Sequence, residues 1–371
     1  MKIRILHVFV TLPVGGAENL LISILRELDP AVYESVVCTL GEGGELAPAV
    51  RALGVPLVEL QVMGRGKPSA GIVPALVDLL RSERIDLVHS HLYHANLHAR
   101  QAARRAGVPS VVSIHNTYTK PKWHRRLRNW WLARHTGAIL VGSEDIRRDV
   151  LRYDQVPPAL VEIIPNSVDL SRSLPVRAVE AVRDELSLPA GAYVLGTIGR
   201  LEIQKGHRVL VEAMAHLRER FPVVLLLIGS GREEAALRAQ VEALGLQAEV
   251  RLLGTRSDLG DLFAVMDLFV MPSLWEGLSL AMLSAMAAGL PVVATDVGGV
   301  AGVLGRDERG WVVPPDAVDA LVEAISFCHD QPAEAAARGE AGRQHVHDHY
   351  SDRAMVRRIE AVYCRVLART A

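Results

Sequence analysis

Short runs of β-branched and aliphatic residues alternate with longer amphipathic stretches along almost the whole chain, and this rhythm limits the possible folds more than any other feature. The runs are apolar at successive positions, as expected of strands buried on both faces. Strands that alternate with helices pair in parallel through right-handed crossovers. The sequence therefore predicts an α/β protein with doubly wound parallel sheets. The predicted strands lie at 3–10, 33–40, 56–60, 85–91, 110–115, 138–143, 160–165, 193–200, 222–231, 249–254, 267–273, 291–296 and 310–315.

The rhythm breaks once, and this break divides the chain into two domains. The segment 171–189 contains prolines and no convincing strand, so it is predicted to be a linker. One domain is expected over residues 1–170 and a second over 190–351. The last helical stretch, 352–371, has no obvious partner in the second domain, and we expect it to pack back on the first. Two facing open-sheet domains would bind ligands in a cleft at the carboxyl ends of their strands.

Charge and cysteine content exclude several classes of protein. Lys and Arg total 41 and Asp and Glu total 42, so no nucleic-acid partner is expected. Three separated cysteines, Cys38, Cys328 and Cys364, form no CxxC pair and indicate reduced thiols in a cytoplasmic protein. The apolar N-terminal run is too short and too mixed for a signal peptide, and no stretch is long enough to span a membrane.

Two predicted strand ends carry residues suited to phosphate. Gly15 and Gly16 follow the first run at the start of a helix, whose free N–H groups favour an anion. The alternative is a tight turn that needs glycine. Arg200 and Lys205 follow the strand at 193–200 and suit a diphosphate, Arg through two hydrogen bonds and Lys as a point charge. Their alternative is a pair of solvated surface charges.

An acid, Glu276, precedes the apolar helix expected in SLWEGLSLAMLSAMAAG. A carboxylate there can accept hydrogen bonds from the vicinal hydroxyls of a sugar, beside the helix-terminal amides of Leu278, Ser279 and Leu280. The alternative is an acid that only stabilises the helix dipole.

Taken together, the segments GGAE, GRLEIQKG, LIGSG, RSDL, DLFVMPSLWEG and AMAAGLPVVATDVGG resemble, in order and spacing, the family 4 glycosyltransferases. The similarity covers nearly the whole chain. It implies the GT-B fold, with two Rossmann-like domains facing a central cleft. It also implies transfer of a hexose from a nucleotide-diphosphate sugar to an acceptor hydroxyl with retention of configuration, without a metal or other cofactor.

The resemblance also implies roles for individual residues. Arg200 and Lys205 would hold the donor diphosphate, on which Gly16 closes, and Glu276 would bind the donor sugar beside the amides that follow Gly277. His115 matches a histidine near that sugar; its alternative is a satisfied histidine at a strand end. The remaining expected donor contacts are backbone groups around Thr255 and Arg256, which would meet the base.

Two positions depart from the family pattern. Ser284 stands where the family has a second acid that binds the ribose hydroxyls, and Gly302 stands where the family usually has another acid. Either the enzyme works with an adjusted ribose pocket, or the chain is a catalytically impaired binding protein that keeps the fold. Retention of the other site residues favours activity. A nucleotide-sugar epimerase of similar shape is a third reading.

The acceptor side offers one unusual segment, 120–135, which holds six Lys or Arg residues and no acid. Trp123, Leu127, Trp130 and Trp131 recur in it at helical spacing. Such a helix suits the surface of an anionic membrane, or it packs its stripe into the first domain. The first reading predicts a glycan or lipid-linked acceptor at the inner face of the membrane.

Histidines gather twice in the sequence, with the spacing of metal ligands. One group lies at 89, 91, 94 and 98 and the other in HVHDH (345–349). No nearby acid or cysteine completes the first set, and no metal site is predicted.

Overall fold

The structure is a computed structural model, and it divides the chain into two compact units. Unit 1 comprises residues 1–167 and 352–371, and unit 2 comprises 168–351. The residues described are 2–64, 67–68, 70–115, 123–165, 167–305 and 308–369.

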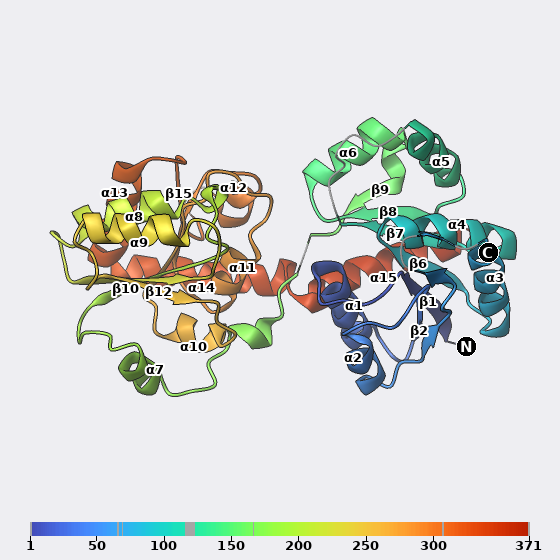
Figure 1. Cartoon of the computed structure of the whole chain (residues 1–371), viewed down its shortest axis with the longest axis horizontal. Coiled ribbons are helices and arrows are strands. Elements are labelled where there is room, and N and C mark those ends of the chain that lie inside the picture. The colour runs from blue at the N-terminus through green and yellow to red at the C-terminus, as the bar shows by residue number, and fades with distance from the viewer. Residues whose placement is uncertain are drawn as a thin grey trace. The chain divides into compact units, whose positions relative to one another are not determined.

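Unit 1 is built on a seven-stranded parallel sheet in the order β3-β2-β1-β6-β7-β8-β9 (Figure 1). Its strands are β1 (Ile3–Phe9), β2 (Tyr33–Thr39), β3 (Leu57–Glu59), β6 (Leu87–His91), β7 (Ser110–Ile114), β8 (Ala138–Val141) and β9 (Val161–Ile163). Its helices are α1 (Gly16–Glu27), α2 (Ala47–Ala52), α3 (Ile72–Ser82), α4 (Tyr93–Ala106), α5 (Trp123–Ala133), α6 (Glu144–Asp154) and α15 (Asp352–Ala368), and a short hairpin joins β4 (Met63–Gly64) to β5 (Lys67–Pro68).

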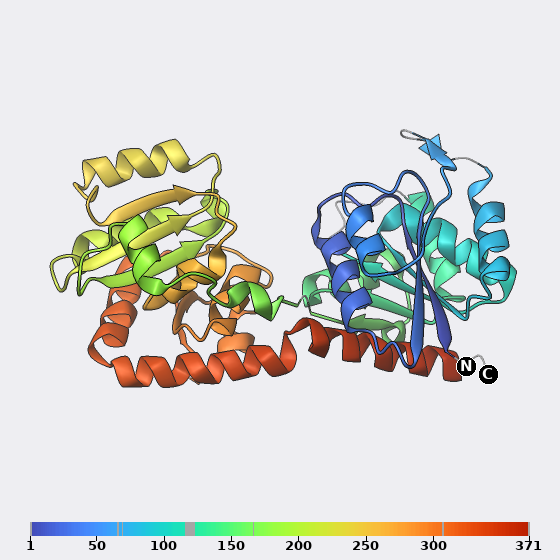
Figure 2. The same ribbon diagram turned by 90° about the horizontal axis from the view of Figure 1, so that it is seen from below.

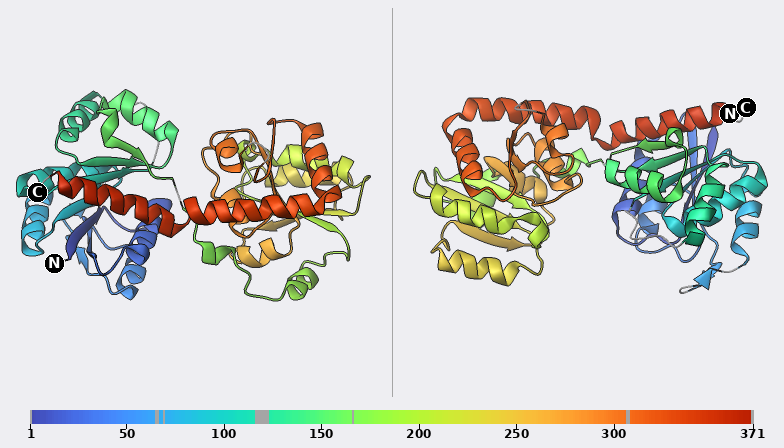
Figure 3. Two further views of the ribbon diagram at one scale, coloured as in Figure 1. Left: turned by 180° about the vertical axis from the view of Figure 1, so that it is seen from behind. Right: turned by 90° about the horizontal axis from the view of Figure 1, so that it is seen from above.

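Helices cover both faces of this sheet because the strands are apolar on both sides. Side chains such as Leu6 and Val88 pack against α3 and α4 on one face. Ile5 and Leu87 point to the other face, where they meet α1 and α15. Figures 2 and 3 show α15 lying along the sheet of unit 1. Gly137 lets the chain approach α15 closely, because a Cβ at this position would lie 2.4 Å from Cγ1 of Val366 on that helix.

Unit 2 repeats the plan with a six-stranded parallel sheet in the order β12-β11-β10-β13-β14-β15. Its strands are β10 (Tyr193–Ile198), β11 (Val223–Ile228), β12 (Val250–Gly254), β13 (Leu268–Met271), β14 (Val292–Thr295) and β15 (Trp311–Val313). Its helices include α7 (Val179–Glu185), α8 (His207–Leu217), α9 (Glu234–Ala243), α10 (Leu259–Ala264), α11 (Leu280–Ala287), α12 (Val300–Leu304), α13 (Val318–Asp330) and α14 (Pro332–His349), with the 3-10 turns η2 (Leu170–Ser173) and η3 (Ile203–Lys205). The core on one face holds α8, α9 and α13, and the core on the other holds α7, α10, α11 and α12.

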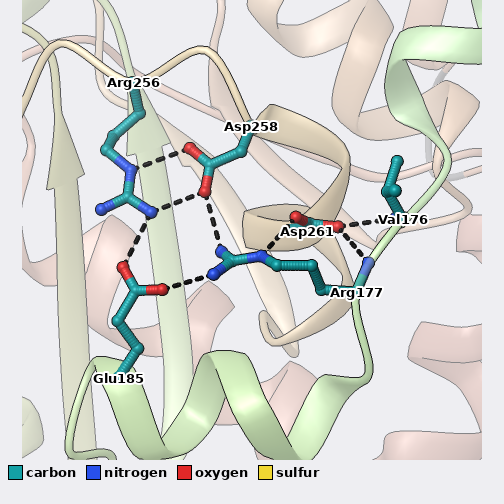
Figure 4. Close-up of polar contacts among 6 residues, drawn as sticks. All are labelled: Val176, Arg177, Glu185, Arg256, Asp258 and Asp261. Atoms are coloured by element: carbon teal, nitrogen blue, oxygen red, sulfur yellow. Dashed lines mark hydrogen bonds and ion pairs between the residues drawn. The ribbon is translucent and has the colours of Figure 1, made fainter.

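The predicted linker, 171–189, is folded into unit 2, so this boundary was placed too late in the chain. Proline content suggested a loop, but one guanidinium holds the segment in place. Arg177 pairs with Asp261 at 2.8 Å and with Asp258 at 2.9 Å, and Asp261 also accepts the backbone N–H of Val176 (Figure 4). On α7, Val182 is fully buried in the core. The chain passes from unit 1 to unit 2 at residues 167 and 168.

Among the described residues, no helix combines the length and apolarity that crossing a bilayer requires.

Candidate functional site

In unit 2 the sheet has a topological switch point between β10 and β13. The chain moves outward from β10 through β11 to β12, then returns to build β13, β14 and β15 on the opposite side. The helices that follow β10 and β13, α8 and α11, therefore cover opposite faces of the sheet. Ligands bind at the carboxyl ends of the strands at such a switch point. Lys205 lies on the first of these loops and Glu276 on the second.

Direct contacts hold the two loops together. The N–H of Leu274 donates to the carbonyl of Gln204 at 2.8 Å, and the Gln204 side chain donates to the carbonyl of Trp275 at 3.0 Å. Gly206 has a φ of +65°, and a Cβ there would lie 1.9 Å from the carbonyl oxygen of Pro272. The glycine of the QKG segment is thus required by both its backbone conformation and this contact.

Lys205 and Glu276 form an ion pair through Nζ and Oε2. Their side chains are 17% and 13% exposed, so the pair is shielded from most solvent. Ser273 Oγ lies 3.5 Å from the same carboxylate oxygen. The sequence predicted a cation for phosphate and an acid for a sugar; the structure brings them into contact with each other.

Arg200 differs from Lys205 in having no internal partner. It follows β10 and is exposed, and within the described part of the chain its guanidinium makes no ion pair or hydrogen bond. All of its donors are therefore available to an anion.

The loop that carries Glu276 is supported from behind by the glycines of DVGG. A Cβ at Gly298, whose φ is +54°, would lie 2.0 Å from the carbonyl oxygen of Glu276. The N–H of Gly299 donates to the carbonyl of Gly277 at 2.9 Å. Two glycines, more than twenty residues away in sequence, thus position the predicted sugar-binding acid.

Helix α11 begins later than the position of Glu276 suggested. Its first residue is Leu280, and Ser279 caps it by accepting the N–H of Met282 at 3.3 Å. The amides of Leu278 and Ser279 therefore precede the helix, and of the three predicted helix-terminal donors only Leu280 lies within it.

Both positions that depart from the family pattern implied by the resemblance have access to solvent. Ser284 is half-buried on α11, and among the described residues its hydroxyl has no hydrogen-bond partner. Gly302 is exposed on α12, and a Cβ there would meet nothing within 4 Å.

The residues predicted to meet the base lie at the end of β12. Thr255 Oγ1 is 3.1 Å from Ser230 Oγ, at the end of the neighbouring β11. Arg256 bonds through its side chain to Asp258 and Glu185, in the network with Arg177 (Figure 4). These bonds occupy the Arg256 guanidinium, and the predicted backbone contacts of Thr255 and Arg256 with the base stay a prediction.

In unit 1, Gly15 precedes α1 and Gly16 is its first residue. A Cβ at Gly15 would lie 2.4 Å from a carboxylate oxygen of Glu18, whereas one at Gly16 would meet nothing within 4 Å. The buried Glu18 carboxylate weakens the attraction of this helix end for phosphate because like charges repel. The open side of the turn is at Gly16.

His115 follows β7, and its Nε2 lies 3.4 Å from Nδ1 of His91 at the end of β6. Burial lowers the pKa of His115 to about 4, so its ring is neutral near pH 7. A second buried histidine, His207 at the start of α8, has its pKa lowered to about 4 by the same cause. The sequence analysis did not single out His207, and the only signal that could have done so is its position directly after Lys205 and Gly206.

One group of histidines has the proximity that a metal site requires. His7, His89 and His91 are fully buried, and each offers a ligand atom within 4.8 Å of the others. However, His89 already bonds Tyr363 at 2.6 Å and Ser113 at 2.8 Å. An ion could bind all three rings only by breaking one of these bonds. The histidines at 94 and 98 and at 345–349, which have the spacing of metal ligands in the sequence, form no such group among the described residues.

Comparisons with known proteins match both units of the chain to glycosyltransferases. A model of the glycosyl transferases group 1 matches residues 179–345, and a model of glycosyltransferase family 4 matches residues 14–172. The UDP-Gal:alpha-D-GlcNAc-diphosphoundecaprenol alpha-1,3-galactosyltransferase of Escherichia coli is 27% identical over 341 residues, which are 87% of each chain. The D-inositol 3-phosphate glycosyltransferase of Salinispora tropica is 30% identical over 358 residues, with 80% of this chain and 72% of the relative covered.

Solved structures share the fold. A glycosyltransferase from Rickettsia africae superposes with a TM-score of 0.84 at 20% identity and covers 99% of both chains. Anabaena Alr3699/HepE, solved in complex with UDP, has a TM-score of 0.79 at 22% identity and covers 98% of this chain and all of its own.

Two Rossmann-like units with parallel sheets, matched over nearly their full length by such structures, define the GT-B fold, as the sequence predicted. Within that class, the chain belongs to the family 4 glycosyltransferases. It is therefore an enzyme of the sugar-transferring kind.

Proposed function

We propose that the protein transfers a hexose from a uridine diphosphate sugar to an acceptor hydroxyl with retention of configuration, in glycolipid or polysaccharide synthesis. The observation that carries the proposal is the Lys205–Glu276 pair at the switch point of unit 2. Arg200, whose guanidinium has no partner among the described residues, follows β10 at the same end of the sheet. The choice of uridine is supported by the names of the Escherichia coli relative and the Anabaena structure. A hexose is supported by that relative's galactosyl transfer.

In the proposed reaction, the donor diphosphate replaces Glu276 as the ion-pair partner of Lys205 and also binds the guanidinium of Arg200. The freed Glu276 carboxylate then accepts hydrogen bonds from the sugar hydroxyls. His115 and Gly16, on unit 1, are proposed to keep the roles toward the sugar and the phosphates that the family resemblance implies. The bond from the anomeric carbon to the diphosphate oxygen breaks, and the acceptor oxygen forms its bond to that carbon on the same face. The departing phosphate oxygen takes the acceptor proton. The two cations stabilise the charge that develops on the diphosphate, so the proposed reaction uses no resident cofactor.

This function can be tested by the release of UDP from a panel of UDP-sugars in the presence of cell-extract lipids and glycans. We expect release with at least one donor, and a UDP-induced thermal shift that is lost in Lys205→Ala. Arg208→Ala, which removes a nearby exposed cation paired with Glu233, serves as the matched control and should keep the shift. UDP binding without any release would instead support the impaired binding protein, the reading that Ser284 and Gly302 favour. Conversion of the donor without UDP release would indicate an epimerase.

The proposed acceptor is lipid-linked, and the proposed location is the cytoplasmic face of an anionic membrane. Support comes from the basic aromatic face of unit 1, which we define as Arg104 on α4 with Leu127, Trp130, Trp131 and Arg134 on or just after α5. Leu127, Trp130 and Trp131 are 57%, 39% and 40% exposed. Arg134 lies 3.4 Å from the centroid of Trp130, and Arg104 lies 4.3 Å from that of Trp131. These apolar groups beside cations suit an interface of anionic lipids.

The opposite side of α5 is fixed to the unit. Asn129 is buried, accepts from Arg100 at 3.0 Å and donates to Asp154 at 3.0 Å. Leu132 and Ala133 are buried beside it. The described part of the predicted stripe thus lies outside the core, and the helix cannot rotate to bury it without breaking these bonds. Residues 120–122 and the side chain of Trp123 lie outside the described residues.

Flotation with vesicles checks this surface. We expect the protein to float with vesicles rich in phosphatidylglycerol and not with pure phosphatidylcholine, and binding to fall at least fivefold in the Trp130→Ala, Trp131→Ala double variant. Phe327→Ala, which removes an equally exposed aromatic from unit 2, should leave binding unchanged. Equal flotation with both kinds of vesicle, or none, would overturn the assignment.

A further inference from the structure

Four histidines form a row on one face of the sheet of unit 1. His7 and His89 occupy paired positions on β1 and β6, and His91 and His115 follow on the same side at the ends of β6 and β7. The rings of His89 and His91 are 4.1 Å apart, and those of His91 and His115 are stacked at 5.6 Å with an interplanar angle of 8°. Only His115 belongs to the proposed site, so the other rings need a separate explanation.

His91 is held from two sides. Its ring stacks on Phe9 with centroids 4.4 Å apart at 14°, and the centroid of the His89 ring lies 4.1 Å away. His89 is itself fixed by the Tyr363 hydroxyl of α15 and by Ser113. Directly after His91, Leu92 has a φ of +65°, a conformation that costs a non-glycine residue free energy and is kept where the surroundings enforce it. The position of the His91 ring is therefore determined by its neighbours.

The hydrogen bond between His91 and His115 has a preferred direction. Both rings are neutral, because burial lowers the pKa of each, so each carries a single N–H. Nε2 of His91 is buried and has no partner within the described ranges of the chain. A buried N–H without an acceptor is rarer than an unused acceptor, so the proton of His91 belongs on Nδ1, where it donates to Nε2 of His115. Nε2 of His115 then accepts, and the proton of His115 must lie on its Nδ1.

We propose that His91 is a positioning residue that holds His115 in the tautomer protonated on Nδ1, so that His115 presents an N–H donor to the reacting sugars. Among the described residues, Nδ1 of His115 has no partner, which leaves this donor available. The role assigned to His115 rests on the proposed function, but its tautomer does not. In this tautomer His115 supplies a hydrogen bond to a sugar oxygen, and it does not act as the base that removes the acceptor proton.

Nuclear magnetic resonance of the full chain with ¹⁵N-labelled histidine tests the proposal directly. Long-range ¹H–¹⁵N correlations distinguish a protonated ring nitrogen from a bare one, and the loss of signals in His115→Gln assigns this residue. We expect a protonated Nδ1 and a bare Nε2 on His115 near pH 7. In His91→Phe, which keeps a flat ring beside Phe9 but removes the N–H, the signals should shift toward a mixture of tautomers.

Activity gives a second readout. Loss of one neutral hydrogen bond predicts a decrease in kcat of roughly three- to tenfold in His91→Phe, with KM for the donor little changed. His91→Asn keeps a donor near the position of Nδ1 and should restore most of the rate and the His115 tautomer. His98→Phe makes the same exchange on α4 outside the row, and both readouts should stay as in the parent protein.

A proton on Nε2 of His115 in the parent protein, or an unchanged tautomer in His91→Phe, would overturn the proposal. If the protein transfers no sugar at all, the proposed function fails, while the tautomer measurement still decides the role of His91.

Discussion

At the scale of single residues, the proposed site departs at Ser284 from the pattern that the family resemblance implies. A carboxylate that binds two ribose hydroxyls makes charge-assisted hydrogen bonds, which a serine cannot replace. The hydroxyl of Ser284 is unpartnered among the described residues, and the half-buried position on α11 has access to solvent. We therefore expect donor binding to depend more on the contacts of the diphosphate with Arg200 and Lys205 than on contacts with the ribose.

Restoring the acid should strengthen donor binding. For Ser284→Glu we expect the affinity for UDP, measured by isothermal titration calorimetry, to rise about tenfold, the equivalent of about 1.4 kcal/mol. Ser284→Gln has the same length without the charge and should gain much less. An unchanged affinity in Ser284→Glu would mean that the ribose pocket has been rebuilt around serine.

At the scale of elements, the turn η3 and the loop after β13 behave as one unit of the site. Gln204 and Gly206 contact that loop through its backbone, and Lys205 contacts it through Glu276. Because these contacts involve main-chain atoms, they fix the loop whatever its side chains are. We infer that the separation of the two charges is determined mainly by this packing.

A methyl group at Gly206 should therefore damage the site and not only the stability. In Gly206→Ala the new Cβ has to displace the carbonyl of Pro272, so we expect UDP affinity to fall at least tenfold and the unfolding free energy to fall by about 2–3 kcal/mol. Gly245→Ala is the matched control, because Gly245 has nearly the same φ, +64°, but a Cβ there would lie 4.0 Å from its nearest contact, the Arg218 guanidinium. It should lose about 1 kcal/mol and keep its UDP affinity. Equal affinities in the two variants would count against the packing argument.

At the scale of the whole molecule, the two units differ in their buried titratable groups. Unit 1 buries His7, His89, His91 and His115 with lowered pKa values, about 3 for His7 and about 4 for His115, whereas unit 2 has His207 as its most strongly shifted histidine. In every case the largest cause is burial, which disfavours the charged ring.

Acid should therefore loosen unit 1 first. When the pKa of a histidine is lower in the folded state, the unfolded state binds more protons than the folded state at any pH between the two pKa values. Its stabilisation is complete above about pH 6.5 and is lost as the pH falls toward 4, at about 1.4 kcal/mol per pH unit for each histidine. Hydrogen–deuterium exchange at pH 7 and pH 5, corrected for intrinsic rates, should show a larger loss of protection in unit 1. Equal losses in the two units would contradict this expectation.

Much of the fold was predictable from the sequence because it depends on local periodicity. The runs at 3–10 and 193–200 became β1 and β10, and the order of strands and helices followed from their alternation. The boundary at 171–189 was wrong because Arg177 and Asp261, far apart in sequence, hold that segment in unit 2. The site was predictable only as a set of strand-end residues, since parallel strands place their ends at one edge.

The sequence by itself determined the two doubly wound sheets, the family, and the strand ends on which Arg200, Lys205, Glu276 and His115 lie, because periodicity and motif spacing are properties of neighbouring residues. Only the tertiary structure decided which of these groups meet. It paired Lys205 with Glu276, placed His91 against His115 and left Trp130 and Trp131 exposed. These outcomes depend on the packing of segments remote in sequence, and packing is set by the whole fold.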